Sequence, residues 1–510
     1  MRKNIILAGM ITVLALSFCA CGEKKEGSVE VVPEALQVKV DNTTTYQDIE
    51  GFGAGYTYYS SYAYYNKYKS EIYDLLFKDA NLSVLRFKNA YMYNENDAPG
   101  TINAKYELEY YNEAKKRLAE DGIEPKVLLS SWSQAAYLKD SESLNGIGTI
   151  ARDENGNYKY KEYGEYFRDA VKAYNDFGVP IDYLSIQNEP DYTAPYESCN
   201  LDFDETAKNA SYTKAFLSTY NALKELDNPP KLIGPDSMSC EYGTISLYID
   251  AILREDPESL YGIGHHLYVG GDEKSPQTFV NHFRNIALEY PDLPKWQTEY
   301  YRGDFMTTVQ LIQNSLLFEN LNCYIFWGGT WKAPAEKDNE NLIGVDSSTK
   351  EEEFFHEHGY VIGEKYYSMR HFSEYILPGY KRVKSGMLSE RKNENVKNDE
   401  IYENTDELST SAYISPDNQD KLVLVTVNDT DEDKLLQYQF EDYHIDSSKV
   451  ILSNYQAGQE DVVVEELYQD AGSLDENQCF EIPAHSVITV VLDGYSEVET
   501  TNGIFNSEKK

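Results

Sequence analysis

The chain has 510 residues, of which 46 are basic and 86 acidic, so its formal net charge at pH 7 is −40. That length exceeds one ordinary domain and suits a large barrel with a smaller companion. A polyanion is repelled by nucleic acids and by anionic membrane surfaces, which disfavours both as partners and favours a neutral substrate. The 45 tyrosines could offer flat faces to sugar rings, although most are expected to serve packing.

The first residues have the pattern of a bacterial export signal. Two basic residues precede an apolar run over 5–16, and Ala20-Cys21 has the form of a lipoprotein cleavage site. The apolar run is shorter than the roughly 20 residues that a membrane span requires. We therefore predict a signal peptide over 1–20, a lipidated Cys21 and a flexible tether over 21–34. The mature protein would then be exported and either anchored by lipid at the cell surface or extracellular.

An alternating strand is predicted over residues 35–50, where Leu36, Val38 and Val40 alternate with polar neighbours. We expect this strand to join a side domain built from both ends of the chain. The glycine-rich segment 51–55 follows directly. It indicates tight backbone rather than a nucleotide site, because no helix start follows it in a compact unit.

Eight repeats of strand and helix are predicted over residues 51–379. The predicted strands end near Gly55, Phe87, Ser130, Gln187, Pro235, Leu267, Glu299 and Trp327. Helical periodicity between them marks 106–119, 163–177, 212–226 and 307–316. Eight such units with right-handed crossovers predict an α/β fold, a (β/α)8 TIM barrel. A doubly wound open sheet is the alternative.

Short, often β-branched segments separated by Asp- and Asn-rich turns follow the predicted barrel. They lie at 411–414, 421–427, 435–440 and 486–492. This pattern is typical of an antiparallel sandwich, so we predict an attached β-sandwich side domain over 380–497. Residues 498–510 have the character of a frayed tail.

Two strands of the predicted barrel end in a glutamate. The segment 181–192, IDYLSIQNEPDY, is an apolar run that stops at Gln187-Asn188-Glu189. The segment 293–300, LPKWQTEY, ends in the same way at Glu299. The carboxyl ends of barrel strands form the floor of the active site in this fold. Glycoside hydrolysis needs two carboxyl groups, so we predict that Glu189 and Glu299 form a catalytic pair.

Other predicted strand ends carry polar or aromatic residues that would meet at the same mouth. These are Arg86, Trp132, Asn188, His266, Tyr268 and Trp327. Singly, an arginine could form a structural ion pair and a tryptophan could fill the barrel. Together they predict a substrate-binding site. In it, Arg86 would lower the pKa of the nucleophile, while Glu189 would donate its proton from a less solvated pocket.

Several ordered blocks of the chain resemble glycoside hydrolase family 30, most nearly its glucuronoxylanase branch, subfamily 8. The blocks are YQDIEGFGA, LRF, SSWSQAAYLK, LSIQNEPDY, YESC, GPDS, HHLY, WQTEYY and YYSMRHFSEYILPGYKRV, and they extend over about residues 37–495. The resemblance implies a (β/α)8 barrel with an attached β-sandwich, and hydrolysis with retention. It makes Glu189 the acid/base and Glu299 the nucleophile. No cofactor is expected.

One block departs from that branch. The glucuronoxylanases place an arginine-containing segment just after the eighth strand, where it grips the acidic side group of xylan. Here Trp327 is followed by Gly328-Gly329-Thr330-Trp331-Lys332, and an acidic loop over 335–359 would repel a uronic acid. The resemblance implies an endo-acting β-1,4-xylanase, and the missing arginine makes us expect that it does not depend on glucuronic acid side groups. We also expect a monomer.

Two alternatives stay open. The substrate could be another β-glycan, such as β-1,6-galactan or β-glucan. The protein could also be a non-catalytic surface lipoprotein that binds glycans, but a binder has no need of both Glu189 and Glu299.

Three features could suggest metal sites, and none is predicted to be one. His356-Glu357-His358 is a lone pair of histidines in a charged loop, where such residues are usually solvated. The acidic segment 428–433 lacks a complete calcium loop and is predicted to be a hairpin turn of the sandwich. The cysteines beyond the signal have no metal-ligand spacing and are expected to be buried thiols or one disulfide. They are Cys199, Cys240, Cys323 and Cys479.

Overall fold

The structure is a computed structural model. It describes residues 30–332, 340–345, 359–388, 402–416, 419–441, 443–455 and 467–496. Several predictions fall outside these residues: the signal peptide, Cys21, most of the tether, most of the acidic loop after Lys332, the His356-Glu357-His358 segment and the tail.

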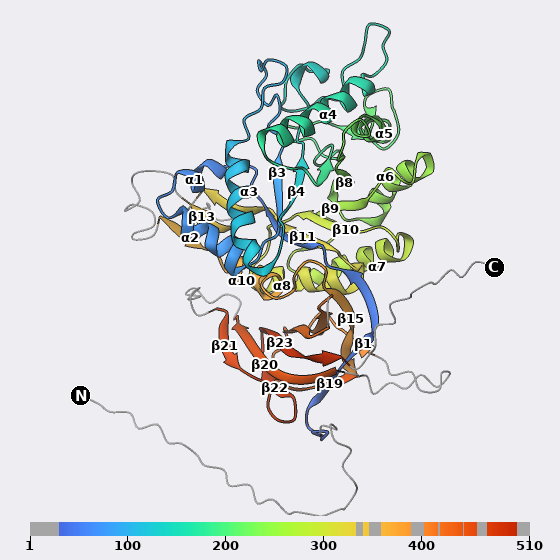
Figure 1. Cartoon of the computed structure of the whole chain (residues 1–510). Coiled ribbons are helices and arrows are strands. Elements are labelled where there is room, and N and C mark those ends of the chain that lie inside the picture. Colours follow the sequence, from blue (N-terminus) through green and yellow to red (C-terminus); the bar gives the residue numbers. More distant parts are fainter. Residues whose placement is uncertain are drawn as a thin grey trace, which may run out of the picture.

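Eight parallel strands close into a barrel, as the sequence predicts (Figure 1). Around the ring they are β2 (Gly51–Gly55), β3 (Val84–Lys88), β4 (Lys126–Ser130), β5 (Tyr183–Ser185), β8 (Lys231–Ser239), β9 (Gly262–Val269), β10 (Lys295–Glu299) and β11 (Cys323–Phe326). The ring closes where β11 pairs with β2, with Cys323 opposite Gly51 and Phe326 opposite Ala54. An open doubly wound sheet is thereby excluded, because it would leave two strands at its edges.

Helices alternate with the strands and flank the barrel (Figure 1). They are α1 (Ser60–Tyr65), α2 (Lys69–Asp74), α3 (Lys105–Leu118), α4 (Tyr160–Phe177), α5 (Tyr212–Leu223), α6 (Tyr242–Glu255), α7 (Val280–Glu289), α8 (Phe305–Asn314) and α10 (Glu364–Ser373). Single π turns, η1 (Leu75–Asp79) and η5 (Ser315–Glu319), extend α2 and α8. In α4 the buried residues Tyr163, Phe167, Ala170 and Tyr174 recur every three or four positions, which puts one apolar stripe on the core side.

The second unit is a ten-stranded sheet that curls beneath the barrel in Figure 1. Its order is β21 (Gln469–Gly472), β20 (Tyr443–Asn454), β23 (Ser486–Ser496), β18 (Lys421–Asn428), β17 (Leu408–Ile414), β15 (Lys381–Leu388), β1 (Leu36–Asp48), β19 (Lys434–Glu441) and β22 (Cys479–Ile482), with β16 (Tyr402–Glu403) beside β15. We call this unit the side sheet. Its concave core includes Val38, Leu424, Leu436 and Val490.

The N-terminal strand β1 lies inside the side sheet rather than at its edge. It pairs antiparallel with β15 and parallel with β19, so one pair of this otherwise antiparallel unit is parallel. Residues 429–433 connect β18 to β19, which do not pair, because β17, β15 and β1 lie between them in the sheet. The predicted hairpin turn at this position is wrong. His485 bridges the acidic segment instead, with Nδ1 2.9 Å from Asp429 Oδ1 and Nε2 3.1 Å from Asp431 Oδ1.

Two small sheets are formed by segments that connect elements of the barrel. One follows the eighth strand and consists of β12 (Gly328–Lys332), β13 (Asn341–Val345) and β14 (Tyr360–Ile362). The other pairs β6 (Leu201–Asp202) with β7 (Ala210–Ser211).

The four cysteines of the described chain are buried free thiols, so the alternative of a disulfide among them is wrong. Among the described residues, no helix is long and apolar enough to cross a bilayer.

His371 on α10 joins the barrel to the side sheet. Its Nδ1 lies 2.8 Å from Thr489 Oγ1 and its Nε2 2.8 Å from Ser453 Oγ. The Thr489 hydroxyl donates to the His371 carbonyl, so this hydroxyl is free to accept only from Nδ1–H. Burial, reinforced by the charge of Arg370, lowers the pKa of His371 to about 3. The contact between the two units therefore requires the neutral imidazole.

This requirement predicts a loss of stability in mild acid. Below pH 6.5 the unfolded chain binds a proton at His371 that the folded chain refuses until about pH 3, so stability falls as the pH decreases. Between pH 6.5 and 5 the wild-type protein should lose about 2 kcal/mol more unfolding free energy than His371→Gln. Denaturant titrations at the two pH values measure this difference. Equal losses in both proteins would show that His371 does not carry the effect.

Candidate active site

Side chains from the carboxyl ends of the barrel strands meet in one buried cluster. Arg86 comes from β3, Asp236 from β8, His266 from β9 and Glu299 from β10. Glu189 lies four positions after the end of β5 in a left-handed conformation with φ 51°. A non-glycine residue there is strained and needs support from its surroundings. The backbone N–H of Glu189 donates to the Asp236 carbonyl at 2.8 Å, which supplies part of that support.

Arg86 connects this cluster. It is fully buried, and its Nη1 donates to Glu299 Oε2 at 2.6 Å. Its Nη2 donates to Asn188 Oδ1 at 2.6 Å and to Asp236 Oδ2 at 3.2 Å. The guanidinium also lies 4.9 Å from the centre of the Trp132 ring. A planar group held on three sides has one orientation, so Arg86 fixes the carboxylate of Glu299 in place.

Asp236 supplies the negative charge at the centre of the cluster. Its carboxylate accepts hydrogen bonds from Ser185 Oγ at 2.6 Å, from Ser130 Oγ at 3.3 Å and from the hydroxyl of Thr298. Burial alone would raise the pKa of Asp236. The charge of Arg86, with that of His266, instead holds this pKa well below its usual range. Asp236 is therefore ionised, and it links its own strand, β8, to five others of the barrel.

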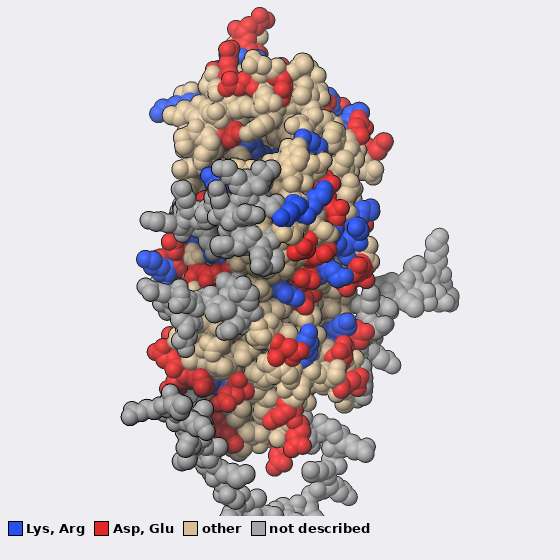
Figure 2. Space-filling model, turned by 90° about the vertical axis from the view of Figure 1, so that its left-hand side faces the viewer, with Lys and Arg blue, Asp and Glu red and all other residues tan. Residues whose placement is uncertain are grey.

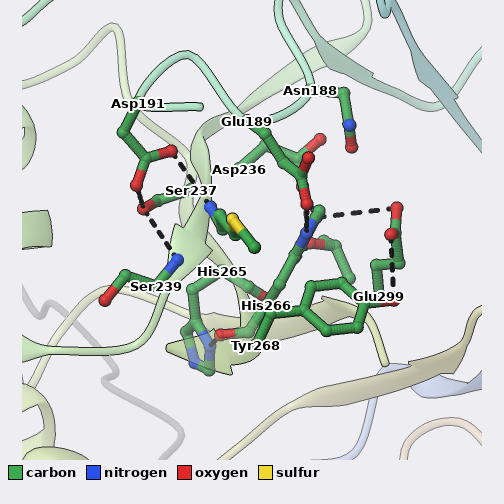
Figure 3. A network of polar contacts seen from close by, with 12 residues as sticks. Asn188, Glu189, Asp191, Asp236, Ser237, Ser239, His265, His266, Tyr268 and Glu299 are labelled. Carbon is green, nitrogen blue, oxygen red and sulfur yellow. Dashed lines mark hydrogen bonds and ion pairs between the residues drawn. The ribbon is translucent and has the colours of Figure 1, made fainter. Parts of the chain in front are cut away.

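His266 lies between the two glutamates (Figure 3). Its Nδ1 is 3.0 Å from Glu189 Oε1, and its Nε2 is 3.4 Å from Asp236 Oδ1 and 3.9 Å from Glu299 Oε2. Burial opposes the charged imidazole, but the negative charge of Glu299 and the bonds to Asp236 and Glu189 raise the pKa of His266 to about 10. His266 is thus a cation at neutral pH.

The glutamates themselves lie close together. One carboxylate oxygen of Glu189 and one of Glu299 are within 4.8 Å of each other, and within that distance of a His266 ring nitrogen. Three such groups could also present ligand atoms to a metal ion. A metal ion at this point would have to displace the proton that His266 carries, because a cationic imidazole has no lone pair to offer.

The charges of the cluster constrain the glutamate pair. Arg86 and His266 are positive and Asp236 is negative, so the cluster is neutral when the two glutamates together carry one negative charge. Glu299 receives two fixed donors, Arg86 Nη1 at 2.6 Å and the Tyr268 hydroxyl at 3.1 Å. These donors favour the charge on Glu299.

The pKa of Glu299 differs from the prediction. The sequence predicts that Arg86 lowers this pKa, and the charges of His266 and Arg86 both act in that direction. Burial outweighs them and, together with the charge of Glu189, raises the pKa of Glu299 above its ordinary value.

A cavity of about 430 Å³ opens above the glutamates, and aromatic rings form much of its wall. The Trp132 and Trp327 rings are 5.9 Å apart, and Trp331 lies 5.4 Å beyond Trp327. Tyr58 is within 6.2 Å of each of these three rings. Trp327 is further fixed by a hydrogen bond from its Nε1 to Glu340 Oε2 at 3.2 Å. Flat, rigid faces around two carboxylates suit a substrate built of rings.

A second ionic group borders the cavity. Lys88 Nζ lies 2.7 Å from Glu197 Oε1 and 4.1 Å from the centre of the Tyr58 ring. Tyr58 donates its hydroxyl to Glu197 Oε2 at 2.9 Å. Burial lowers the pKa of Lys88 to about 8, although Glu197 opposes this. Glu197 and Tyr58 reach the cavity and Lys88 stands behind them.

The structure divides the residues that the sequence predicts for substrate binding. Trp132, Tyr268 and Trp327 line the cavity, as do Glu189 and Glu299. Arg86, Asn188 and His266 are buried behind the glutamates and contact them or each other, so they are placed to position rather than to bind.

Sequence reasoning missed several residues of the site. Asp236 lies in the GPDS block and Glu197 in the YESC block, but neither was identified as a site residue because acidic residues are common in this chain. Arg302 and Trp331 also line the cavity. Trp331 follows the eighth strand, in the segment that lacks the arginine of the glucuronoxylanases, and its aromatic ring is the signal that could have identified it.

Comparisons with known proteins agree with this architecture. No family model matches the chain. Among curated proteins, it is 22% identical over 397 residues to endo-1,6-beta-D-glucanase neg1 of Aspergillus fumigatus, covering 67% of this chain and 74% of that protein. It is 22% identical over 280 residues to glucuronoxylanase XynC of Bacillus subtilis, covering 50% and 53%. It is 23% identical over 296 residues to putative glucosylceramidase 1 of Caenorhabditis elegans, covering 52% and 53%. The chain thus spans about half the length of the last two relatives.

Solved structures share the whole fold. The catalytic domain of GH30 xylanase C from Talaromyces cellulolyticus superposes with a TM-score of 0.65 at 16% identity, covering 89% of this chain and 99% of that one. The glycoside hydrolase family 30 subfamily 8 xylanase Xyn30A from Clostridium acetobutylicum has a TM-score of 0.61 at 21% identity, covering 90% and 99%. The resemblance to family 30 that the sequence blocks indicate is confirmed at the level of the fold.

The buried cluster predicts a large effect of removing the Asp236 charge. Asp236→Asn leaves two buried cations, Arg86 and His266, without their shared partner, and should lower the free energy of unfolding by about 3 kcal/mol or more. Asp191→Asn is the matched control, because Asp191 is an exposed carboxylate that accepts from Ser237 Oγ at 2.6 Å. It should cost about 1 kcal/mol or less. Denaturant unfolding of both variants tests this, and similar losses would contradict a central role for Asp236.

Proposed function

We propose that the protein is a retaining glycoside hydrolase of the family 30 type, with Glu299 as nucleophile and Glu189 as acid/base. The observation that supports this most directly is the separation of the two carboxylates, whose nearest oxygens are within 4.8 Å. Retaining sites hold their carboxyl groups about 5–5.5 Å apart, whereas inverting sites need about 6.5–9.5 Å to seat a water molecule.

In the first step of the proposed reaction, the Glu299 carboxylate attacks the anomeric carbon of the sugar. The bond from that carbon to the glycosidic oxygen breaks, and the carboxyl proton of Glu189 passes to the departing oxygen. The product is an ester between the sugar and Glu299. Arg86 Nη1 and the Tyr268 hydroxyl hold the attacking carboxylate at 2.6 and 3.1 Å, so that little reorganisation is needed.

In the second step, the Glu189 carboxylate takes a proton from a water molecule as its oxygen attacks the same carbon. The ester bond breaks, Glu299 regains its carboxylate, and Glu189 again carries the proton. The sugar leaves with its original anomeric configuration. The cation His266, 3.0 Å from Glu189 Oε1, stabilises the negative charge that Glu189 carries between the two steps.

For the substrate we propose a β-1,4-xylan backbone, cleaved internally. The cavity is open and walled by Trp132, Trp327 and Trp331, which provide successive stacking faces for sugar rings. Two solved xylanase structures share the fold. A β-1,6-glucan is the second candidate, because the relative that covers most of this chain among those described above is an endo-1,6-glucanase.

Two cations near the cavity could contact an acidic side group of the polysaccharide. Lys332, in the segment that lacks the arginine, is exposed, and its Nζ lies 5.3 Å from the centre of the Tyr59 ring. Arg302 follows β10 and lines the cavity, with its guanidinium 5.1 Å from the centre of the Tyr268 ring and 3.9 Å from Glu273. Neither has the fixed, buried setting that would make one acidic side group obligatory.

The setting of the enzyme is proposed from the sequence alone. The export signal and Cys21 support a protein held by lipid at a cell surface, or released outside the cell, where polysaccharide is the partner. We expect it to act as a monomer.

The two glutamates should respond differently to substitution. Glu189→Ala removes the proton donor, which matters for a poor leaving group and little for a good one. It should reduce polysaccharide cleavage by about 10²–10⁴-fold while an aryl glycoside with an activated leaving group still forms the sugar ester. Glu299→Gln should abolish turnover of both substrates. Steady-state rates and intact mass of the protein measure the two outcomes.

A fluoro-sugar inactivator that forms its ester on any residue other than Glu299 would contradict this division of roles. Equal losses on both substrates for Glu189→Ala would also contradict it. Circular dichroism of each variant controls for folding.

Substrate choice is tested with a panel of polysaccharides. Linear and arabinose-bearing xylan should be cleaved about as readily as glucuronoxylan, because loss of a charge-assisted contact of roughly 1.5–3 kcal/mol erases a requirement for the side group. Product analysis by mass spectrometry checks this. Products that all carry one uronic acid at a fixed position, with no cleavage of linear xylan, would refute it. Activity on β-1,6-glucan or β-1,6-galactan with none on any xylan would favour the alternative substrates.

A further inference from the structure

A second cavity lies between the barrel and the side sheet, on the outer surface of the barrel. Its volume is about 460 Å³, close to that of the cavity above the glutamates. Residues from α7 and η5 line it on the barrel side, and residues from β1, β15 and β16 line it on the sheet side. We call it the basic pocket, because Arg284, Arg382 and Lys384 line it.

Each of the three cations lies over an aromatic ring of the same pocket. Arg284 is 4.6 Å from the centre of the Phe318 ring, Arg382 is 3.8 Å from that of Tyr46, and Lys384 is 4.0 Å from that of Tyr402. Such contacts hold long, flexible side chains in place without neutralising their charge. The pocket therefore presents positioned positive charge.

Arg382 is the most firmly held of the three. Only 5% of it is exposed. Its Nε donates to Gln47 Oε1 at 2.9 Å and its Nη2 to Asn320 Oδ1 at 2.6 Å, so these bonds go to neutral amide oxygens. Buried charges in proteins are usually paired with an opposite charge. A guanidinium fixed in this way is suited to an anion that comes from outside the chain.

No Asp or Glu is among the described residues that line the basic pocket, although the chain has 86 of them. Asp41, which pairs with Lys384 across the two strands, directs its carboxylate to the hydroxyls of Thr43 and Thr44. Asp406 is near enough to feel the charge of Arg284 but does not line the pocket. On the face that Figure 2 shows, by contrast, acidic side chains occur over both the barrel and the side sheet. The pocket is thus a local exception in a strongly acidic protein.

Apolar surface accompanies the charge. Leu288 on α7 is 75% exposed and Tyr46 is 42% exposed, and both line the pocket. Sugars bind through apolar ring faces and polar edges, and a uronic acid adds a carboxylate that an arginine can grip. A small inorganic anion would use the cations but not the apolar surface.

We propose that the basic pocket is a second glycan-binding site, separate from the catalytic cavity, that takes a chain segment bearing uronic acid carboxylates. Bound there, an acidic polysaccharide would be held against a protein that otherwise repels it. The site would raise the local concentration of glycan near the enzyme without contributing to bond cleavage.

Trigalacturonate is the probe, titrated by calorimetry into the full chain at low salt. The double variant Arg284→Gln/Lys384→Gln should weaken binding by about tenfold or more, because two charge-assisted contacts are lost. The matched control is Arg152→Gln/Lys224→Gln, which removes two cations that also lie over aromatic rings, those of Tyr158 and Tyr220 at 3.7 and 4.0 Å, outside the pocket. The control should bind as the wild type does. Raising the salt concentration should weaken binding to the wild type.

Two further titrations distinguish binding of an acidic glycan from binding of a neutral sugar or of a small anion. A neutral trisaccharide, xylotriose, should not lose affinity in the double variant, and inorganic phosphate should bind wild type more weakly than trigalacturonate. Absence of trigalacturonate binding, equal loss in both double variants, or tighter binding of phosphate would overturn the proposal. Hydrolysis of an aryl glycoside should be unchanged in the Arg284→Gln/Lys384→Gln variant. Because the binding measurement does not depend on turnover, failure of the proposed hydrolase activity would leave this test intact.

Discussion

The ion pair between Arg86 and Asp236 at the centre of the barrel is the interaction on which the site depends. Both side chains are fully buried, and their nearest charged atoms are 3.2 Å apart. Each charge is also compensated by a second partner, Arg86 by Glu299 at 2.6 Å and Asp236 by His266 at 3.4 Å, because an unpaired buried charge costs several kcal/mol. The hydroxyls of Ser130, Ser185 and Thr298 complete the shell of Asp236. One carboxylate thus joins the strands whose ends carry the residues of the candidate site, and the closed ring of strands brings those residues within reach of one another.

The same charges shape the proposed chemistry. With Arg86 and His266 positive and Asp236 negative, the cluster is neutral when the two glutamates together carry one negative charge. A double displacement needs this state at its start, with one carboxylate to attack and one acid to donate. The charge balance leaves open which glutamate is ionised. The hydrogen bonds from Arg86 and Tyr268 to Glu299 favour the charge there, against the burial that raises its pKa, and this is the ground for proposing Glu299 as the attacking group.

Local patterns in the sequence were sufficient to predict much of the fold. Apolar runs ending in polar residues identified the eight barrel strands, and alternation identified the 35–50 strand, because each signal lies within a few residues. Contacts between distant segments were not visible in this way. The connection over 429–433 looks like a hairpin turn locally, but the strands that it joins, β18 and β19, are separated in the sheet by β17, β15 and β1. The meeting of Glu189 and Glu299 at one mouth could be predicted because each lies at the end of a recognisable strand. Asp236 was not, because its importance comes from five strands that meet around it.

The stereochemistry of cleavage tests the central claim most directly, since it follows from the separation of Glu189 and Glu299 and from nothing else in the fold. Proton NMR of the first minutes of hydrolysis of a β-linked xylan, before mutarotation, reports the anomer of each new reducing end. Two glutamates with oxygens within 4.8 Å predict that the β anomer appears first and the α anomer only later. Initial appearance of the α anomer would mean inversion and would contradict the account.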